Sequence, residues 1–214
     1  MNLPITFTSL PVPYFFIAFV IFIAVLAHRR RRQTRSQQKA NENFLEQERI
    51  ANSTRKQDIS DLDYLHFDID ALPINEYPHE SLTSCEIVLV ELSMRKIINL
   101  SDYTNTQLKR MYGPANFKTL SACDDCYQIL CEALHTYAER QLALDRTEAA
   151  AAILEYAVSL NLEYSNIYVL LAEIYDKQSE PEKIRRLIEL LSGTDKKYAA
   201  AALKKLETFC VNEA

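Results

Sequence analysis

The chain has 214 residues, with 24 Lys and Arg against 29 Asp and Glu, and 48% of its residues are hydrophobic, which is ordinary for a globular protein. It contains only two glycines, Gly113 and Gly193. Loops that cradle phosphate need several glycines, so the sequence excludes P-loop and dinucleotide-binding sites. The scarcity of glycine, with abundant Ala, Leu, Glu and Lys, favours an all-α fold.

An uncharged apolar segment is the first predicted element. No charged residue occurs from Leu10 to Ala27, and a helix of that length spans roughly 27 Å, close to the bilayer core of about 30 Å. Basic residues follow the segment and none precedes it. The positive-inside rule therefore predicts a single-pass transmembrane helix over residues 10–28, with residues 1–9 outside and the rest cytoplasmic. A bacterial plasma membrane is the expected location, and a mitochondrial outer membrane is the alternative.

The arginines after this segment define its orientation. The predicted membrane-flanking residues are Arg29, Arg30, Arg31, Arg32 and Arg35. A cleaved secretory signal is the rival interpretation, but such a signal carries its positive charges before the apolar run. The same arginines are placed to contact anionic lipid, although they can equally serve as a topology signal alone.

Two polar segments separate the predicted anchor from the rest of the chain. Residues 29–57 are basic and polar with few apolar side chains, which predicts a juxtamembrane linker or a solvated helix. Residues 58–82 are acidic, and apolar residues alternate with polar ones from Leu65 to Ala71, as in an extended segment on a surface. A calcium loop would need a glycine and a terminal glutamate at fixed offsets, so we expect a solvated acidic linker and no metal.

Helical signals continue from residue 83 to 214. Thr83 and Glu86 form a potential capping box. Apolar residues then follow at helical spacing: Ile87, Val90, Met94 and Ile97. Thr104 or Asn105 can begin a short helix that stops at Gly113, and Ser121 with Asp124 can begin a long one that ends near Ala143. Further helices are predicted near 146–160, 164–177, 181–191 and 195–210.

A repeat with a period of 34 residues lies within this helical region. The first copy, 131–164, supplies Leu134, Tyr137, Ala138, Ala150, Leu154 and Ala157. The second copy, 165–198, supplies Tyr168, Leu171, Ala172, Tyr175, Ile184, Ile188 and Leu191. On these residues the chain resembles the tetratricopeptide repeat family, although Gln141 stands where an aromatic residue is usual and Ile184 replaces a small alanine. The resemblance implies helical hairpins capped by 195–210; a generic array of helical hairpins is the alternative.

The cysteines invite a metal hypothesis. Cys123, Cys126, Cys131 and His135 resemble a zinc-binding set. On one helix, however, Cys123 and His135 would be about 18 Å apart along the axis, too far for a single tetrahedral ion. A second Cys-x-x-Cys pair is also missing. We therefore expect buried thiols and neither a metal nor another cofactor.

The family resemblance also implies a concave groove along the first helix of each repeat. Carried over by position, the groove residues are Glu132, His135 and Glu139 from the first copy and Asn166, Val169, Glu173 and Asp176 from the second. This groove would be acidic. Its expected partner is a protein with a basic or amphipathic segment, and neither nucleic acid nor a small-molecule substrate is expected.

The sequence thus predicts a non-enzymatic adaptor, tethered to a membrane and carrying a helical-repeat domain. A structural subunit of a larger membrane complex, with specificity in the transmembrane helix, is the alternative. Residues 99–117 are unusually distinctive for a spacer, and their role is left open at this point.

Overall fold

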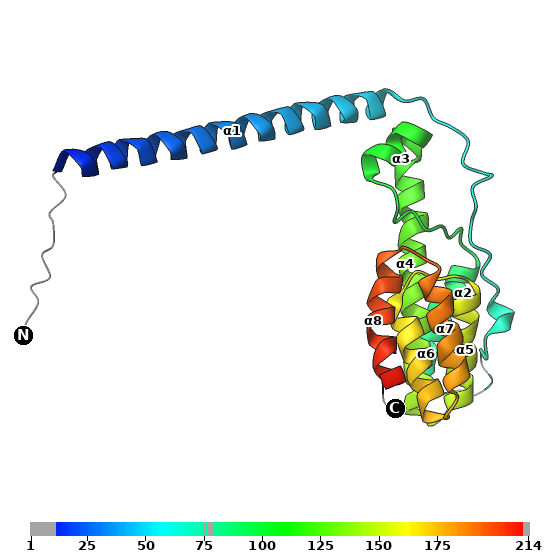
Figure 1. Ribbon diagram of the computed structural model, residues 1–214. Helices are drawn as coiled ribbons and strands as arrows, with labels where there is room; N and C mark the ends of the chain where they lie inside the picture. The colour runs from blue at the N-terminus through cyan, green and yellow to red at the C-terminus, as the bar shows by residue number, and fades with distance from the viewer. Residues whose placement is uncertain (1–11, 75, 77–78, 212–214) are drawn as a thin grey trace, which may run out of the picture.

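A computed structural model describes residues 12–74, 76 and 79–211, and within them the protein is all-helical, with no strand. The helices are α1 (Val12–Ser53), η1 (Ile69–Ala71), α2 (Glu80–Ser93), α3 (Asn105–Tyr112), α4 (Pro114–Ala143), α5 (Thr147–Ser159), α6 (Ser165–Lys177), α7 (Pro181–Ser192) and α8 (Lys197–Val211). Figure 1 shows two contrasting parts, a long helix α1 and a compact helical array that contains α2 and α4–α8.

Helix α1 runs without interruption for 42 residues and extends away from the array (Figure 1). Of the two structures predicted for residues 29–57, the solvated helix is therefore confirmed as far as Ser53, and the unstructured linker is wrong there. The predicted transmembrane segment starts at Leu10, which lies outside the described residues. Within the part of the chain that is described, no helix combines the length and the apolar character needed to cross a membrane.

The acidic segment after α1 is extended, as the alternation predicts, but it is attached to the array. Leu65 N donates to Ile97 O at 2.8 Å, which forms an isolated antiparallel bridge. Phe67 is buried, whereas its neighbours in sequence are exposed. The Tyr156 hydroxyl accepts from Asp68 N at 2.8 Å and donates to Asp68 O at 2.9 Å, so helix α5 holds this segment by its backbone.

Helices α4–α7 are connected by short turns, so consecutive helices pack side by side in opposite directions (Figure 1). The turns repeat at the same interval as the sequence. Asp145 and Ser179, 34 residues apart, both have positive φ, at 59° and 57°. The following residues also match, because Arg146 N donates to Gln141 O at 3.0 Å and Glu180 N donates to Tyr175 O at 2.9 Å. The period of 34 residues is therefore a property of the backbone.

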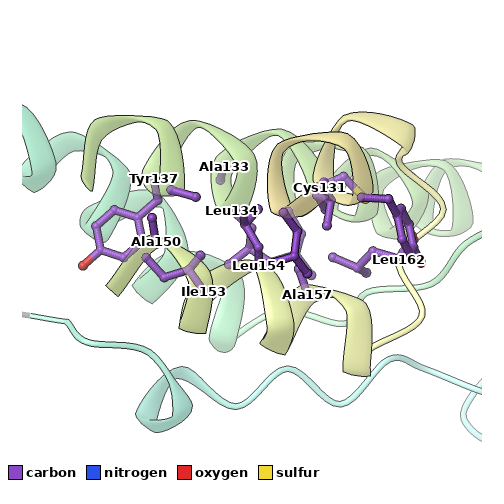
Figure 2. Packing of buried hydrophobic residues seen from close by; sticks show 14 of the residues in the cluster. Cys131, Ala133, Leu134, Tyr137, Ala150, Ile153, Leu154, Ala157 and Leu162 are labelled. Atoms are coloured by element: carbon purple, nitrogen blue, oxygen red, sulfur yellow. The ribbon is translucent and has the colours of Figure 1, made fainter. Parts of the chain in front are cut away.

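The core of the array lies between these helices. Figure 2 shows Leu134 and Tyr137 of α4 facing Ile153 and Leu154 of α5, with the small Ala150 among them. All five side chains are fully buried. Because alanine occupies little volume, it lets the two helices approach closely while the larger side chains fill the space on either side.

Two helices begin earlier than the sequence signals suggest. Helix α2 starts at Glu80, where His79 accepts from Ser81 N, so the predicted capping box at Thr83 is wrong. Helix α4 starts at Pro114 and not at Ser121. Proline is favourable in the first turn because its missing N–H has no helical acceptor there. The helix predicted from Thr104 to Gly113 is confirmed, including its capping box.

The apolar stripe of α2 also differs from its sequence pattern. Ile87, Val90 and Met94 are exposed, by 55%, 39% and 77%, although Ile97 beyond the helix is buried. The buried face of α2 consists of Leu82, Cys85, Glu86, Leu89 and Leu92. Both sets have helical spacing, so periodicity alone cannot identify the face that packs on α4.

Candidate partner-binding groove

The residues predicted on α4 are partly accessible. Glu132 and Glu139 are exposed, and His135 between them is half-buried. His135 Nδ1 lies 3.5 Å from Glu139 Oε2. Its ring packs edge-on against Tyr164, with centroids 5.8 Å apart. Helical spacing of three and four residues places these side chains on one face of α4.

The residues predicted on α6 divide into accessible and buried positions. Glu173 and Asp176 are exposed, and Asn166 is half-buried, with Nδ2 donating to the Tyr164 hydroxyl at 3.4 Å. Val169 is only 8% exposed and belongs to the main core cluster, so it offers almost no surface to a partner. Tyr164 links the two predicted sets, and the sequence gave no reason to select it because it precedes α6.

The accessible part of this face is acidic. Its exposed carboxylates are Glu132, Glu139, Glu173 and Asp176, with His135 as the basic group among the predicted residues. An acidic surface attracts cationic segments and disfavours anionic ones. This part of the molecule therefore has the charge needed to contact a basic partner.

A buried polar network holds α2 on the back of α4. The Tyr137 hydroxyl lies 3.0 Å from both Glu86 Oε1 and Pro73 O. Burial, reinforced by the Glu86 carboxylate, raises the pKa of Tyr137 well above its ordinary value. Tyr137 therefore stays neutral and serves as a fixed hydrogen-bonding group.

The thiols are structural in character. Cys85, Cys123, Cys126 and Cys131 are free and buried, and burial raises the pKa of Cys131 to about 12. A protonated, buried thiol is a poor nucleophile and a poor metal ligand. Cys123 and His135 both lie on α4, and the described residues contain no group of three or more side chains placed to hold a metal ion.

The predicted membrane-flanking arginines lie on α1, far along the helix from the array (Figure 1). Arg29 and Arg30 are exposed. The side chains of Arg31, Arg32 and Arg35 lie outside the described part of the structure.

A second set of contacts, which the sequence did not predict, joins α1 to α3. Glu48 forms an ion pair with Lys109 at 2.9 Å and a hydrogen bond with the Thr106 hydroxyl. Beside this pair, Ala51 is fully buried. The α1–α3 joint, as we call these contacts together with those of Gly113 and Asn116 described next, fixes the end of α1.

Backbone packing completes the α1–α3 joint. Gly113 has φ of +86°, and a Cβ at this position would lie 2.8 Å from Arg55 O. The buried Asn116 donates through Nδ2 to Gln57 O at 2.6 Å and to Tyr112 O at 2.8 Å. Part of the distinctive sequence 99–117 thus forms the seat that receives the end of α1.

Comparison with known proteins finds no match: no protein-family model, no curated protein and no solved structure matches this chain.

Proposed function

We propose that this protein is a membrane-tethered adaptor whose helical array recruits a basic or amphipathic segment of a partner protein. The observation that carries the proposal is the apolar surface of α1 between residues 16 and 26. Its side chains are exposed: Phe16, Ile17, Phe19, Val20, Ile21, Phe22, Ile23, Val25 and Leu26. They point to every side of the helix, so a single packed partner helix would leave many of them in water, whereas lipid would cover them all.

The rest of α1 supports a role as a stalk. If residues 10–28 cross the bilayer, Arg29 marks the membrane surface, and the 25 residues from Arg29 to Ser53 extend about 37 Å from it. The α1–α3 joint then holds the array at the far end. The tether is consequently a rigid spacer, in contrast to the flexible linker expected from polar composition.

The array supports the adaptor half of the proposal. Its 34-residue repeat appears in packing and in turn geometry, which is the arrangement of tetratricopeptide-like repeats. In this arrangement the first helices, α4 and α6, line the binding face. The carboxylates there fit a partner rich in lysine or arginine.

Extraction of membranes with alkaline carbonate tests the anchor. We expect the full-length chain to remain in the membrane pellet and the double variant Ile21→Lys/Phe22→Lys to be released. Phe44→Lys/Leu45→Lys is the matched control, because these residues are also exposed apolar side chains of α1 but lie beyond the arginines. Release of the unaltered chain, or equal release of both variants, would refute the anchor.

Photocrosslinking in the native membrane tests recruitment. A photoreactive residue at position 139 or 173 should capture a defined protein, whereas the same residue at 189, an exposed glutamate on α7, should not. Replacing the apolar segment of α1 with an unrelated transmembrane helix should leave this capture intact. Loss of capture after the exchange would favour a complex subunit whose specificity lies in its membrane helix.

A further inference from the structure

A cavity outside the predicted groove lies where the acidic segment, the loop before α3, helix α4 and the α5–α6 turn meet. Its volume is about 500 Å³. Three tyrosines from three separate elements line it: Tyr103, Tyr112 and Tyr127. Tyr103 is 45% exposed and Tyr127 only 4%, so aromatic surface continues from the opening of the cavity to its inner wall.

Hydrogen bonds to the backbone hold the walls of this cavity in place. Leu100 N donates to Asp124 Oδ1 at 2.8 Å, and Ile98 N donates to Cys123 O at 3.3 Å, so α4 fixes the loop before α3. On the opposite wall, Glu163 N donates to the Tyr127 hydroxyl at 2.7 Å. A preformed cavity binds its ligand without the cost of ordering loops.

The charges around the cavity are all of one sign. Asp61, Asp63 and Glu163 line it, and its described lining contains no lysine or arginine. Glu163 is held from outside by Lys196, which also lies 2.9 Å from Asp102, whereas Asp61 and Asp63 are exposed. The opening therefore has two carboxylates available to a cation.

Tyrosine faces add a second attraction for the same kind of ligand. A cation within about 6 Å of a tyrosine ring is attracted to its face. The chain uses this interaction beside the cavity, where Lys96 Nζ lies 4.4 Å from the ring centroid of Tyr64. Carboxylates at the opening and tyrosines within thus select for an ammonium or guanidinium group on an apolar stem.

We propose that this cavity binds a lysine or arginine side chain of the partner protein, as an anchor site separate from the groove on α4 and α6. The inference rests on the proposed function for its choice of a basic partner, but it uses different residues. It also gives residues 99–103 a role, because Asn99, Leu100 and Tyr103 form one wall of the site.

Fluorine NMR of the full-length chain in detergent, labelled with 3-fluorotyrosine, tests this site. The probe is an acetylated and amidated Gly-Arg-Gly-Arg-Gly peptide, and the same peptide with citrulline in place of arginine is the neutral control. Signals assigned with Tyr103→Phe and Tyr112→Phe should shift with the arginine peptide and not with the citrulline peptide. Asp61→Asn/Asp63→Asn should weaken binding about fivefold, whereas Glu189→Gln/Glu207→Gln should not.

The outcomes separate the cavity from the groove. No shift of these signals at millimolar peptide, or equal binding of the citrulline peptide, overturns the cavity site. Binding that is lost in Glu139→Gln/Glu173→Gln but unchanged in Asp61→Asn/Asp63→Asn leaves the proposed groove standing and removes the cavity. The reverse pattern supports the cavity and removes the groove.

Discussion

Helix α1 and the helical array have the same secondary structure but different sources of stability. In the array, large side chains such as Tyr137 and Leu154 are fully buried between neighbouring helices. In α1, Ala51 is the one buried side chain among those described, and it lies at the α1–α3 joint. The array therefore provides its own apolar environment, whereas the first half of α1 needs another one. This difference is the physical basis for assigning the membrane role to α1 and the recruiting role to the array.

The largest expected effect comes from the core of the array. Leu154→Ala removes a fully buried side chain between α4 and α5 and should lower the free energy of unfolding by about 3 kcal/mol. Leu190→Ala is the matched control on α7, where the side chain is 47% exposed, and should change it by less than about 0.5 kcal/mol. Chemical denaturation followed by circular dichroism measures both. Similar losses would contradict the assigned core.

A change at the α1–α3 joint should have the next largest effect. Gly113→Ala places a Cβ 2.8 Å from Arg55 O at a φ of +86° and should cost about 2 kcal/mol, or displace α1. Gly193→Ala is the control, because its Cβ would meet Leu190 O at an ordinary 3.6 Å.

Pulsed electron resonance between non-cysteine labels at positions 39 and 200 shows which response occurs. A broadened distance distribution in Gly113→Ala, with unchanged distances in Gly193→Ala, is the expected result. Indistinguishable variants would mean that the joint does not fix the stalk.

A smaller effect, of opposite sign, is expected at Gln141. This side chain is fully buried, and its amide makes no hydrogen bond of normal geometry within the described part of the protein. Gln141→Met keeps a similar shape without the buried amide and should raise the free energy of unfolding by about 1 kcal/mol. Thermal unfolding of this variant measures the change, and a lower unfolding temperature would show that the amide is satisfied.

The smallest effect concerns Glu48 and pH. Hydrogen bonds from Lys109 and Thr106 hold the pKa of Glu48 below its ordinary value of 4.5. Because the folded pKa is lowered, the contribution of Glu48 is present above pH 4.5 and is lost as pH falls through the folded pKa. The distance distribution between positions 39 and 200 should therefore broaden in acid. In Glu48→Gln it should already be broader at neutral pH and change less on acidification.

Local signals predicted much of the secondary structure. The helix from Thr104 to Gly113 was predictable because its capping box and terminal glycine are both local. The start of α4 was missed because Gly113 and Pro114 signal the end of one helix and also the start of the next. The start of α2 was missed because histidine is an uncommon N-cap residue.

The candidate sites depended more on tertiary structure. Helical spacing placed Glu132 and Glu139 on an accessible face, but it could not show that Val169 is buried. The α1–α3 joint pairs Glu48 with Lys109, 61 residues away, and the cavity brings Tyr103, Tyr112 and Tyr127 together from different elements. Contacts of this kind follow from packing and leave no periodic pattern in one sequence.

Hydrogen exchange on the full-length chain in lipid nanodiscs tests the central claim most directly. Residues 16–26 of α1 should be protected from exchange, residues 36–50 should exchange as a solvated helix, and the buried helices of the array should be protected as strongly as in detergent. Rapid exchange of residues 16–26 in the presence of lipid, or failure of the chain to associate with nanodiscs, would contradict a membrane-anchored stalk.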